Sequence, residues 1–379
     1  MLKKCFQYRL KKAHIEQDLD QIIAECCWLY NYFLQIRRER DQNKQKQPTK
    51  NEQEKLLIQL KEQRPQLRLI FSQVLQNVAN RVDETWKNYR QHKKINSKSG
   101  YPRFKPLSKY NSFTYKQFGF KLKGNQLTLS CGHEKEELIL NIRLHRQLQG
   151  KTKTLSVVRK NGKYYSCFAN EVEKKFLPKT DKKVGVDLGL IDFCTLDDGK
   201  KYSNPRIYKK GVKKVIEAQK VVDRKEKGSN NQKKVRLLVA KKWEKLTNQA
   251  KHYSHQIANE LVRNYDYIGM EDLKTKKMIE NKKGIWKNVR KSIQQVRWNT
   301  TQNIVARKVE ETGGQLVKVD PAYTSQTCSF CDEPSKVKVE LSQRVYECWK
   351  CRVKLDRDVN SAKNILKLAE PRFGASLRA

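Results

Sequence analysis

The chain has 379 residues, enough for two or three domains, and carries 82 Lys and Arg against 40 Asp and Glu, a net charge of +42 at pH 7. It has no run of about 18 apolar residues and no apolar signal stretch at its N-terminus, so neither a membrane-spanning nor a secreted protein is expected. A charge surplus of this size disfavours compaction unless a polyanion neutralises it. Because the basic residues extend over the whole length among aromatic ones, nucleic acid is the expected partner.

The first hundred residues are predicted to form a helical lobe. Residues 15–40 and 66–92 carry apolar side chains every three or four positions, which is typical of helices with one buried face. Residues 41–54 are polar and contain Pro48, and are therefore predicted to be a loop.

Short strands are predicted to follow this lobe. Residues 100–117 alternate aromatic and basic side chains, which suits base stacking and phosphate binding; a loop that packs its aromatics inward fits the composition equally well. Between 118 and 178 the pattern favours a small β-domain of the oligonucleotide-binding barrel type. Its clearest hairpin turns at Asn161-Gly162.

From residue 183 onwards, strands alternate with helices. This order predicts a ribonuclease H-like α/β core that opens with a hairpin. The expected elements are a strand VGVD, a second strand after a sharp turn, a helical hairpin over 212–265 broken at Gly228-Ser229, a strand YIGM, a basic helix over about 285–312, a strand QLVKVD and a final helix NSAKNILKLA.

Three acids fall where such a core would bring them together. Asp187 and Glu271 end or follow apolar strands, and Asp358 begins the last helix, where the helix dipole favours an ionised carboxylate. Cleavage of a phosphodiester by two magnesium ions needs carboxylates that bridge and flank the metal pair, with Asp187 expected to bridge. Each acid alone is as easily a turn residue or a helix cap. The rival acids are Asp192, Asp197, Asp198, Asp272, Asp320 and Asp356, of which Asp356 cannot be separated from Asp358 by the helix start alone.

Four of the ten cysteines form two CxxC pairs, and sixteen residues separate the pairs. This spacing is typical of one tetrahedral zinc ion bound by four thiolates. No His lies nearby, so the predicted zinc site is closed and structural, with a hairpin between the pairs; the other six cysteines are scattered and are expected to be small buried thiols. The zinc ligands are Cys328, Cys331, Cys348 and Cys351.

At these motifs the sequence resembles the TnpB (OrfB) family of insertion-sequence-encoded proteins, relatives of type V CRISPR effector nucleases. The resemblance rests on VGVDLG, YIGMEDL, DPAYTSQTCSFC, YECWKC and DRDVNSAKNI, together with GYPRFKPLSKYNSFTY and DRKEKGSNNQKK. Within DRDVNSAKNI, the family's catalytic acid matches the Asp of DxNxA, which selects Asp358 over Asp356. The sequence departs from the family at Arg352, where Gly commonly follows the last Cys, and at Ser361, where Ala is common.

The resemblance implies a multidomain α+β protein with one RuvC nuclease site. It also implies a guide RNA from the transposon end, double-stranded target DNA, recognition of a short target-adjacent motif, and a prokaryotic, nucleoid-associated setting in the cytoplasm. The implied domains are a wedge strand at 1–12, a helical recognition lobe at 13–100, the β-barrel wedge at 101–180, the nuclease core at 181–321, the zinc ribbon at 322–354, the final nuclease helix at 355–370 and a tail at 371–379.

Other functions compatible with the sequence are an accessory transposase and a catalytically inactive RNA-guided binding or regulatory protein. The order Asp, Glu, Asp is unlike the usual order in transposases of the ribonuclease H-like type. Because all three acids are present, an active nuclease is favoured. No coiled-coil periodicity indicates a dimer, and a monomer is expected.

Overall fold

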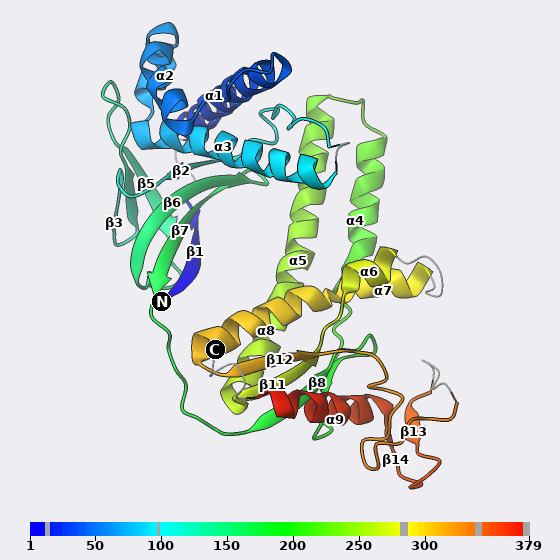
Figure 1. Cartoon of the computed structure of the whole chain (residues 1–379). Helices are drawn as coiled ribbons and strands as arrows, with labels where there is room; N and C mark the ends of the chain where they lie inside the picture. The colour runs from blue at the N-terminus through cyan, green and yellow to red at the C-terminus, as the bar shows by residue number, and fades with distance from the viewer. Residues whose placement is uncertain (12–15, 97–98, 281–286, 338–342, 374–379) are drawn as a thin grey trace. The chain divides into compact units, whose positions relative to one another are not determined.

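The computed structural model describes residues 1–11, 16–96, 99–280, 287–337 and 343–373. The chain divides into two compact units, an N-terminal unit of Met1–Glu173 and a C-terminal unit of Lys174–Ala379 (Figure 1). Among the described helices, none is both long and apolar enough to cross a bilayer.

The N-terminal unit is built on a seven-stranded sheet with the order β2-β6-β7-β1-β5-β4-β3. The first strand of the chain lies near the middle, paired antiparallel with β7 and β5. The predicted hairpin is confirmed: β6 and β7 turn at Asn161 and Gly162, whose φ angles are 51° and 70°. Closure of this sheet into a barrel stays a prediction. Its strands are β1 Leu2–Leu10, β2 Ser112–Tyr115, β3 Phe120–Lys123, β4 Gln126–Leu129, β5 Leu138–Arg143, β6 Lys151–Lys160 and β7 Lys163–Val172.

Three α-helices are inserted between β1 and β2: α1 Glu16–Gln42, α2 Lys50–Gln63 and α3 Ser72–Ile95, with a short 3-10 helix at Pro65–Leu69. The two predicted helices are confirmed as α1 and α3, but the prediction of a loop through residue 54 was wrong. Thr49 caps α2 and forms a capping box with Glu52, because each side chain bonds the other residue's backbone N–H. Side chains from these helices share one hydrophobic core with the sheet.

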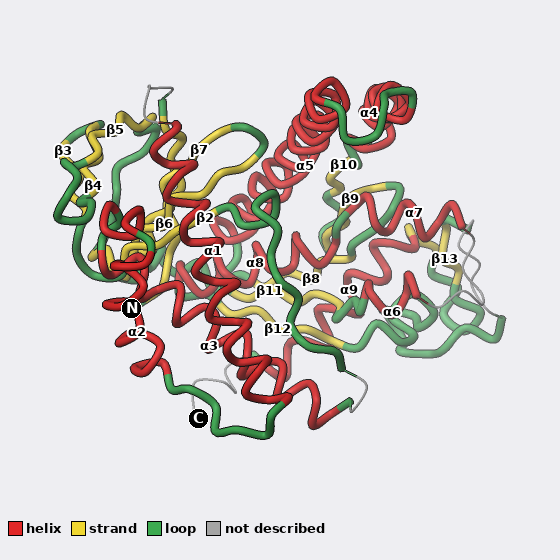
Figure 2. The backbone as a smooth tube through the Cα atoms, turned by 90° about the horizontal axis from the view of Figure 1, so that it is seen from above, coloured by secondary structure: helices red, strands yellow, loops and turns green. Residues whose placement is uncertain are grey.

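The C-terminal unit contains a five-stranded sheet with the order β10-β9-β8-β11-β12. Strands β8, β11 and β12 are parallel, and β9 and β10 form an antiparallel extension. Helices α5 and α8 lie on one side of the sheet and α9 on the other (Figures 1 and 2). This arrangement agrees with the predicted α/β pattern, while its identification as a ribonuclease H-like core stays a prediction. Its strands are β8 Lys183–Asp187, β9 Asp192–Leu196, β10 Lys201–Ser203, β11 Tyr267–Glu271 and β12 Gln315–Val319.

The helices of this unit follow the predicted order with two differences. The helical hairpin breaks where expected, with Gly228 at a φ of 88° and Ser229 capping α5. The single predicted helix over 285–312 is two helices, because Arg297 has a φ of 59° between them, and α6 was not predicted. The helices are α4 Ile207–Asp223, α5 Asn230–Asn264, α6 Thr275–Glu280, α7 Lys287–Val296, α8 Trp298–Thr312 and α9 Arg357–Ala369.

The segment between β12 and α9 holds the two CxxC pairs and a small two-stranded sheet, β13 Val345–Glu347 with β14 Lys354–Asp356. We call residues 322–354 the ribbon. The hairpin predicted between the cysteine pairs lies partly outside the described residues, at 338–342, as does most of the predicted tail, at 374–379.

Candidate active site

Two neighbouring parallel strands end at the first two predicted acids. Strands β8 and β11 pair with Val186 opposite Met270, so Asp187 and Glu271 follow at matching positions. Glu271 is buried and Asp187 is half-buried. The carboxyl ends of the strands are the usual location of a site in an open parallel sheet.

The third acid comes from α9, which packs very closely on the same two strands. A Cβ atom at Gly185 in β8 would lie 2.0 Å from the carbonyl oxygen of Ala362, and one at Gly269 in β11 would lie 2.8 Å from Cβ of Ala369. Only glycine allows a helix backbone to approach a strand this closely. The first turn of α9, which contains Asp358, is thereby held near the ends of β8 and β11.

The two acids at the start of α9 have different roles in the structure. Asp356 is the N-cap, accepting hydrogen bonds from the backbone N–H groups of Asp358 at 2.9 Å and Val359 at 3.2 Å. Partial burial opposes ionisation of Asp356, but hydrogen bonds from Lys201 and the helix N–H groups hold its pKa below the usual value. Asp358 is buried, and its charge acts on Asp187.

Charges of one sign are concentrated around Asp187. Burial of its carboxyl group, together with the charges of Glu271 and Asp358, raises the pKa of Asp187 well above its usual range, while Arg357 acts in the opposite direction. Burial also raises the pKa of Glu271, against the effect of a hydrogen bond from Thr324. Strongly raised carboxylate pKa values in one cluster are typical of a site that binds cations.

Two arginines, one from the ribbon and one from α9, place positive charge beside Asp358. Arg344 Nη1 lies 3.2 Å from Asp358 Oδ2, and Arg357 Nη2 lies 3.7 Å from Asp358 Oδ1.

The oxygen atoms of the three carboxylates lie too far apart, within the described residues, for all three to bind one ion. A pair of ions about 3.5–4 Å apart needs a wider arrangement than a single ion does.

Glu271 is held by two residues that the sequence analysis did not identify. Thr324 Oγ1 donates a 2.6 Å hydrogen bond to Glu271 Oε1, and the side-chain amide of Gln302 in α8 donates to the Glu271 backbone carbonyl. Asn364 of α9 in turn donates to the carbonyl of Thr324 at 2.9 Å. Thr324 belongs to the motif DPAYTSQTCSFC, and that motif was the feature of the sequence that could have marked it as a site residue. Nothing in the spacing of the motif indicates a contact with Glu271.

The four predicted zinc ligands come together in the ribbon. Their sulfur atoms all lie within 4.8 Å of one another, with separations of 3.7 Å for Cys328 and Cys351 and 3.6 Å for Cys331 and Cys348. Four sulfurs placed about 2.3 Å from a central zinc ion at tetrahedral angles would be about 3.8 Å apart. The donor set and its dimensions therefore fit one closed, structural zinc site.

Each cysteine pair is closed by a turn with the same geometry. The N–H of Asp332 bonds the carbonyl of Cys328, and the N–H of Arg352 bonds the carbonyl of Cys348, both at 3.0 Å. Asp332 and Arg352 both have positive φ angles, 56° and 62°. This left-handed conformation is one that glycine adopts more readily than residues with a Cβ atom.

Two asparagines of α9 attach the ribbon to the helix that bears Asp358. Asn360 accepts a 2.9 Å hydrogen bond from the N–H of Ser329 and donates to the carbonyl of Thr327 at 2.8 Å. Asn364, one turn further along, donates to the same Thr327 carbonyl at 2.7 Å. The zinc-binding segment and the third acid are thus parts of one hydrogen-bonded assembly.

Comparisons with known proteins agree with these features. Residues 167–282 match the OrfB_IS605 family, described as "Probable transposase", and residues 298–365 match the "Cas12f1-like, TNB domain". The chain is 29% identical to the "Putative RNA-guided DNA endonuclease InsQ" of Escherichia coli K12 over 312 residues, 78% of this chain and 74% of that protein. It is 31% identical to a "Putative RNA-guided DNA endonuclease" of Streptomyces pristinaespiralis over 274 residues, 71% of this chain and 65% of that protein.

Among solved structures, the fold resembles Cas12f1 in a complex with sgRNA and target DNA. The TM-score is 0.63 at 16% identity, covering 93% of this chain and 83% of that one. The two family matches, over residues 167–282 and 298–365, include the ends of β8 and β11, the ribbon and most of α9. These matches confirm the resemblance to the OrfB (TnpB) family that the motifs indicated.

Proposed function

We propose that this chain is an RNA-guided DNA endonuclease of a transposable element that cuts target DNA at one RuvC-type site. The observation that carries the proposal is the approach of Asp187, Glu271 and Asp358 from β8, β11 and α9, with their charges acting on one carboxyl group. The printed names of the Escherichia coli and Streptomyces relatives support RNA guidance and DNA cleavage. The net charge of +42 supports two polyanionic partners.

The three carboxylates fit magnesium, because hard divalent cations prefer carboxylate oxygens and because a cluster of buried acids with raised pKa values favours a cation. We propose that Asp187, Glu271 and Asp358 would together hold two magnesium ions. When bound, this metal pair would supply an activated water and stabilise the leaving 3′ oxygen.

The remaining residues of the site hold these ligands in position. Thr324 orients the Glu271 carboxylate, and Asp356 holds the first turn of α9, so that Asp358 is fixed by the helix start. Arg344 is the counter-ion of Asp358 in this structure. We propose that Arg344, whose guanidinium lies beside Asp358, would contact the scissile phosphate. Zinc would be held by the four ribbon cysteines and would order the ribbon from which Arg344 extends.

The finer assignment of domains belongs to the same proposal. Residues 101–180 with the strand at 1–12 would form the wedge, 13–100 the recognition lobe, 181–321 with 355–370 the nuclease core and 322–354 the zinc ribbon. Recognition of a short target-adjacent motif would fall to the first two of these parts. The N-terminal unit ends at Glu173, and the C-terminal unit begins at Lys174.

The deciding experiment is to purify the chain, sequence the RNA that co-purifies and measure magnesium-dependent cleavage of DNA matched to that RNA. Asp187→Ala should abolish cleavage and retain RNA binding. Asp272→Asn is the matched control, because Asp272 follows Glu271 directly but its side chain is 46% exposed. Cleavage by Asp187→Ala at the wild-type rate would refute the site. Binding of RNA and DNA without cleavage by the wild-type chain would instead favour the alternative of an RNA-guided binding protein.

A further inference from the structure

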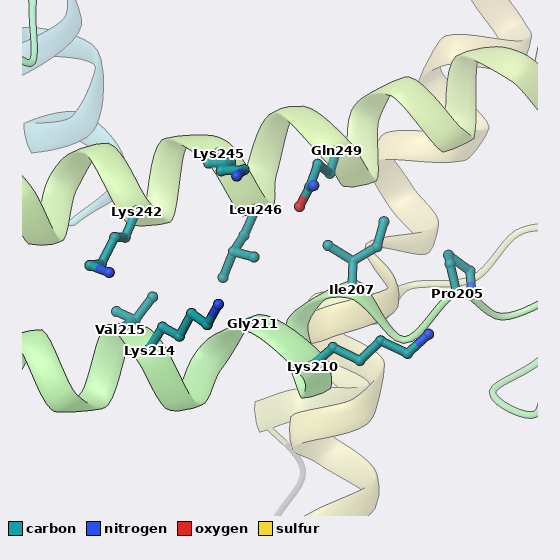
Figure 3. Close-up of a pocket in the computed structure, with 10 residues that line it drawn as sticks. All are labelled: Pro205, Ile207, Lys210, Gly211, Lys214, Val215, Lys242, Lys245, Leu246 and Gln249. Carbon is teal, nitrogen blue, oxygen red and sulfur yellow. The ribbon is translucent and has the colours of Figure 1, made fainter.

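A hollow of about 640 Å³ lies between helices α4 and α5 (Figure 3). We call it the hairpin pocket. Its floor is apolar and comes from both helices: Ile207 and Val215 extend from α4, and Leu246 extends towards them from α5. The rim is basic. It is formed by Lys210 and Lys214 of α4, Lys242 and Lys245 of α5, and the amide of Gln249.

The pocket is a built part of the hairpin. Val215 and Leu246 belong to the apolar cluster that holds α4 against α5, so the floor is fixed by the packing of the two helices. At Gly211 a Cβ atom would lie 2.2 Å from Leu246 Cδ2. The glycine therefore lets Leu246 lie against α4, whereas a larger residue would push it into the pocket.

Among the residues that the structure describes, no acidic side chain pairs with the lysines around the pocket. No carboxylate lines it, and none of the four lysines takes part in a salt bridge with the described residues. Lys210 and Lys214 are four positions apart on one helix, and Lys242 and Lys245 are three apart on the other. Such like-charge pairs on one helix face destabilise the helix. A bound anion would remove this repulsion.

A second hollow, of about 270 Å³, shares one lining residue with the hairpin pocket. Both hollows are lined by Ile207, and the second is also lined by Leu190 and Arg206. Leu190 follows Asp187 by three residues, and its carbonyl accepts a 2.8 Å hydrogen bond from Asn204. The wall of the second hollow thus includes a residue that lies three positions along the chain from Asp187.

We propose that the hairpin pocket binds a nucleotide of single-stranded DNA that leads to the catalytic carboxylates. Its base or sugar would lie on Ile207, Val215 and Leu246, and the lysines would contact the flanking phosphates. The volume is within the range of about 300–1,000 Å³ of ordinary ligand pockets. This inference rests on the proposed function and deepens it, because it identifies a binding site for the DNA strand that is to be cut.

The test measures binding of a labelled thymidine homopolymer to the RNA-bound chain in EDTA, where no cleavage occurs. Replacing the four rim lysines by Gln should weaken binding by about tenfold or more and reduce the slope of log affinity against log salt by up to about 3. The matched control replaces four exposed lysines of the same helices that do not line the pocket: Lys213, Lys220, Lys241 and Lys251. The control should change affinity by no more than about threefold.

A neutral variant separates the pocket from general electrostatic attraction. Gln249→Trp should fill the hollow and weaken binding by about fivefold or more while leaving the salt slope unchanged, because it removes no charge. Gln249 is exposed, so the fold should tolerate this change. The proposal is overturned if the control lysines matter as much as the rim lysines, or if Gln249→Trp binds DNA normally. Weakened binding of a uridine homopolymer with unchanged DNA binding would also overturn it, by assigning the pocket to RNA. Since metal is absent, these results do not depend on whether the chain cleaves DNA.

Discussion

Gly185→Ala tests the close contact between β8 and α9. The new Cβ would lie 2.0 Å from the Ala362 carbonyl oxygen and 2.8 Å from the Leu366 backbone nitrogen, whereas ordinary van der Waals contact begins at 3.4 Å. Both neighbours are backbone atoms, which cannot rotate away as a side chain can. The helix must therefore move away from the strand by about 1.4 Å, the shortfall of the shorter contact.

Such a movement would act on both activity and stability. Asp358 moves with α9, and a displacement of about 1 Å at a catalytic group can lower the rate by about 10²-fold. Overpacking of this kind costs about 1–3 kcal/mol, and each kcal/mol lowers the Tm of a unit of this size by about 2–4 °C.

The assay is single-turnover cleavage by the RNA-bound chain, with thermal melting and RNA binding measured on the same preparations. Gly100→Ala is the control, because a Cβ there has nothing within 4 Å. Wild-type cleavage and an unchanged Tm in Gly185→Ala would show that the contact does not position Asp358.

Three further predictions concern single side chains of the C-terminal unit. The raised pKa of Asp187 means that the folded state prefers the protonated carboxyl group, so its contribution to stability is present below about pH 3.9 and is lost as pH rises through the raised value. In EDTA at neutral pH, Asp187→Asn should therefore have a higher Tm than wild type, with a free energy of unfolding larger by about 1.4 kcal/mol per unit of pKa elevation. A Tm difference that shrinks with rising pH would contradict this reasoning. Thr324→Val should lower cleavage by about tenfold, because Glu271 loses a 2.6 Å hydrogen bond, and Thr324→Ser should restore it with nucleic-acid binding unchanged throughout. Arg352→Gly should stabilise the ribbon by about 1 kcal/mol, because Arg352 has a φ of 62°; zinc release to a chelator should become about fivefold slower, and faster release would refute the strain argument.

Local signals in the sequence predicted those elements that local chemistry controls. Asn161-Gly162 specifies a tight turn because both residues tolerate positive φ, and the break at Gly228-Ser229 combines a flexible residue with a helix cap. Helix α2 was missed because its polar start and Pro48 suggested a loop. The capping box of Thr49 and Glu52 was the signal that would have located it.

The site was predictable as far as the strands define it. Asp187 and Glu271 end strands that become parallel neighbours, so the pattern alone indicated where they would meet. Which acid of the last helix joins them depends on how the cap forms: Asp356 is used by the helix N–H groups and Lys201, and only the fold shows this. Thr324 lies 53 residues from Glu271 in sequence, and no short-range pattern relates a loop hydroxyl to a carboxylate at that distance.

The hydrogen bonds from Asn360 and Asn364 to the ribbon have a consequence for engineering. They join the cysteine-bearing loops and α9 into a single unit, in which the carbonyl of Thr327 accepts from both asparagines. A shortened or chimeric nuclease that exchanges the ribbon while keeping the host's own helix would leave these amides without acceptors and would loosen Thr324 as well. A segment transferred to another protein should therefore begin before residue 320 and end after residue 370, so that it contains both the ribbon and α9.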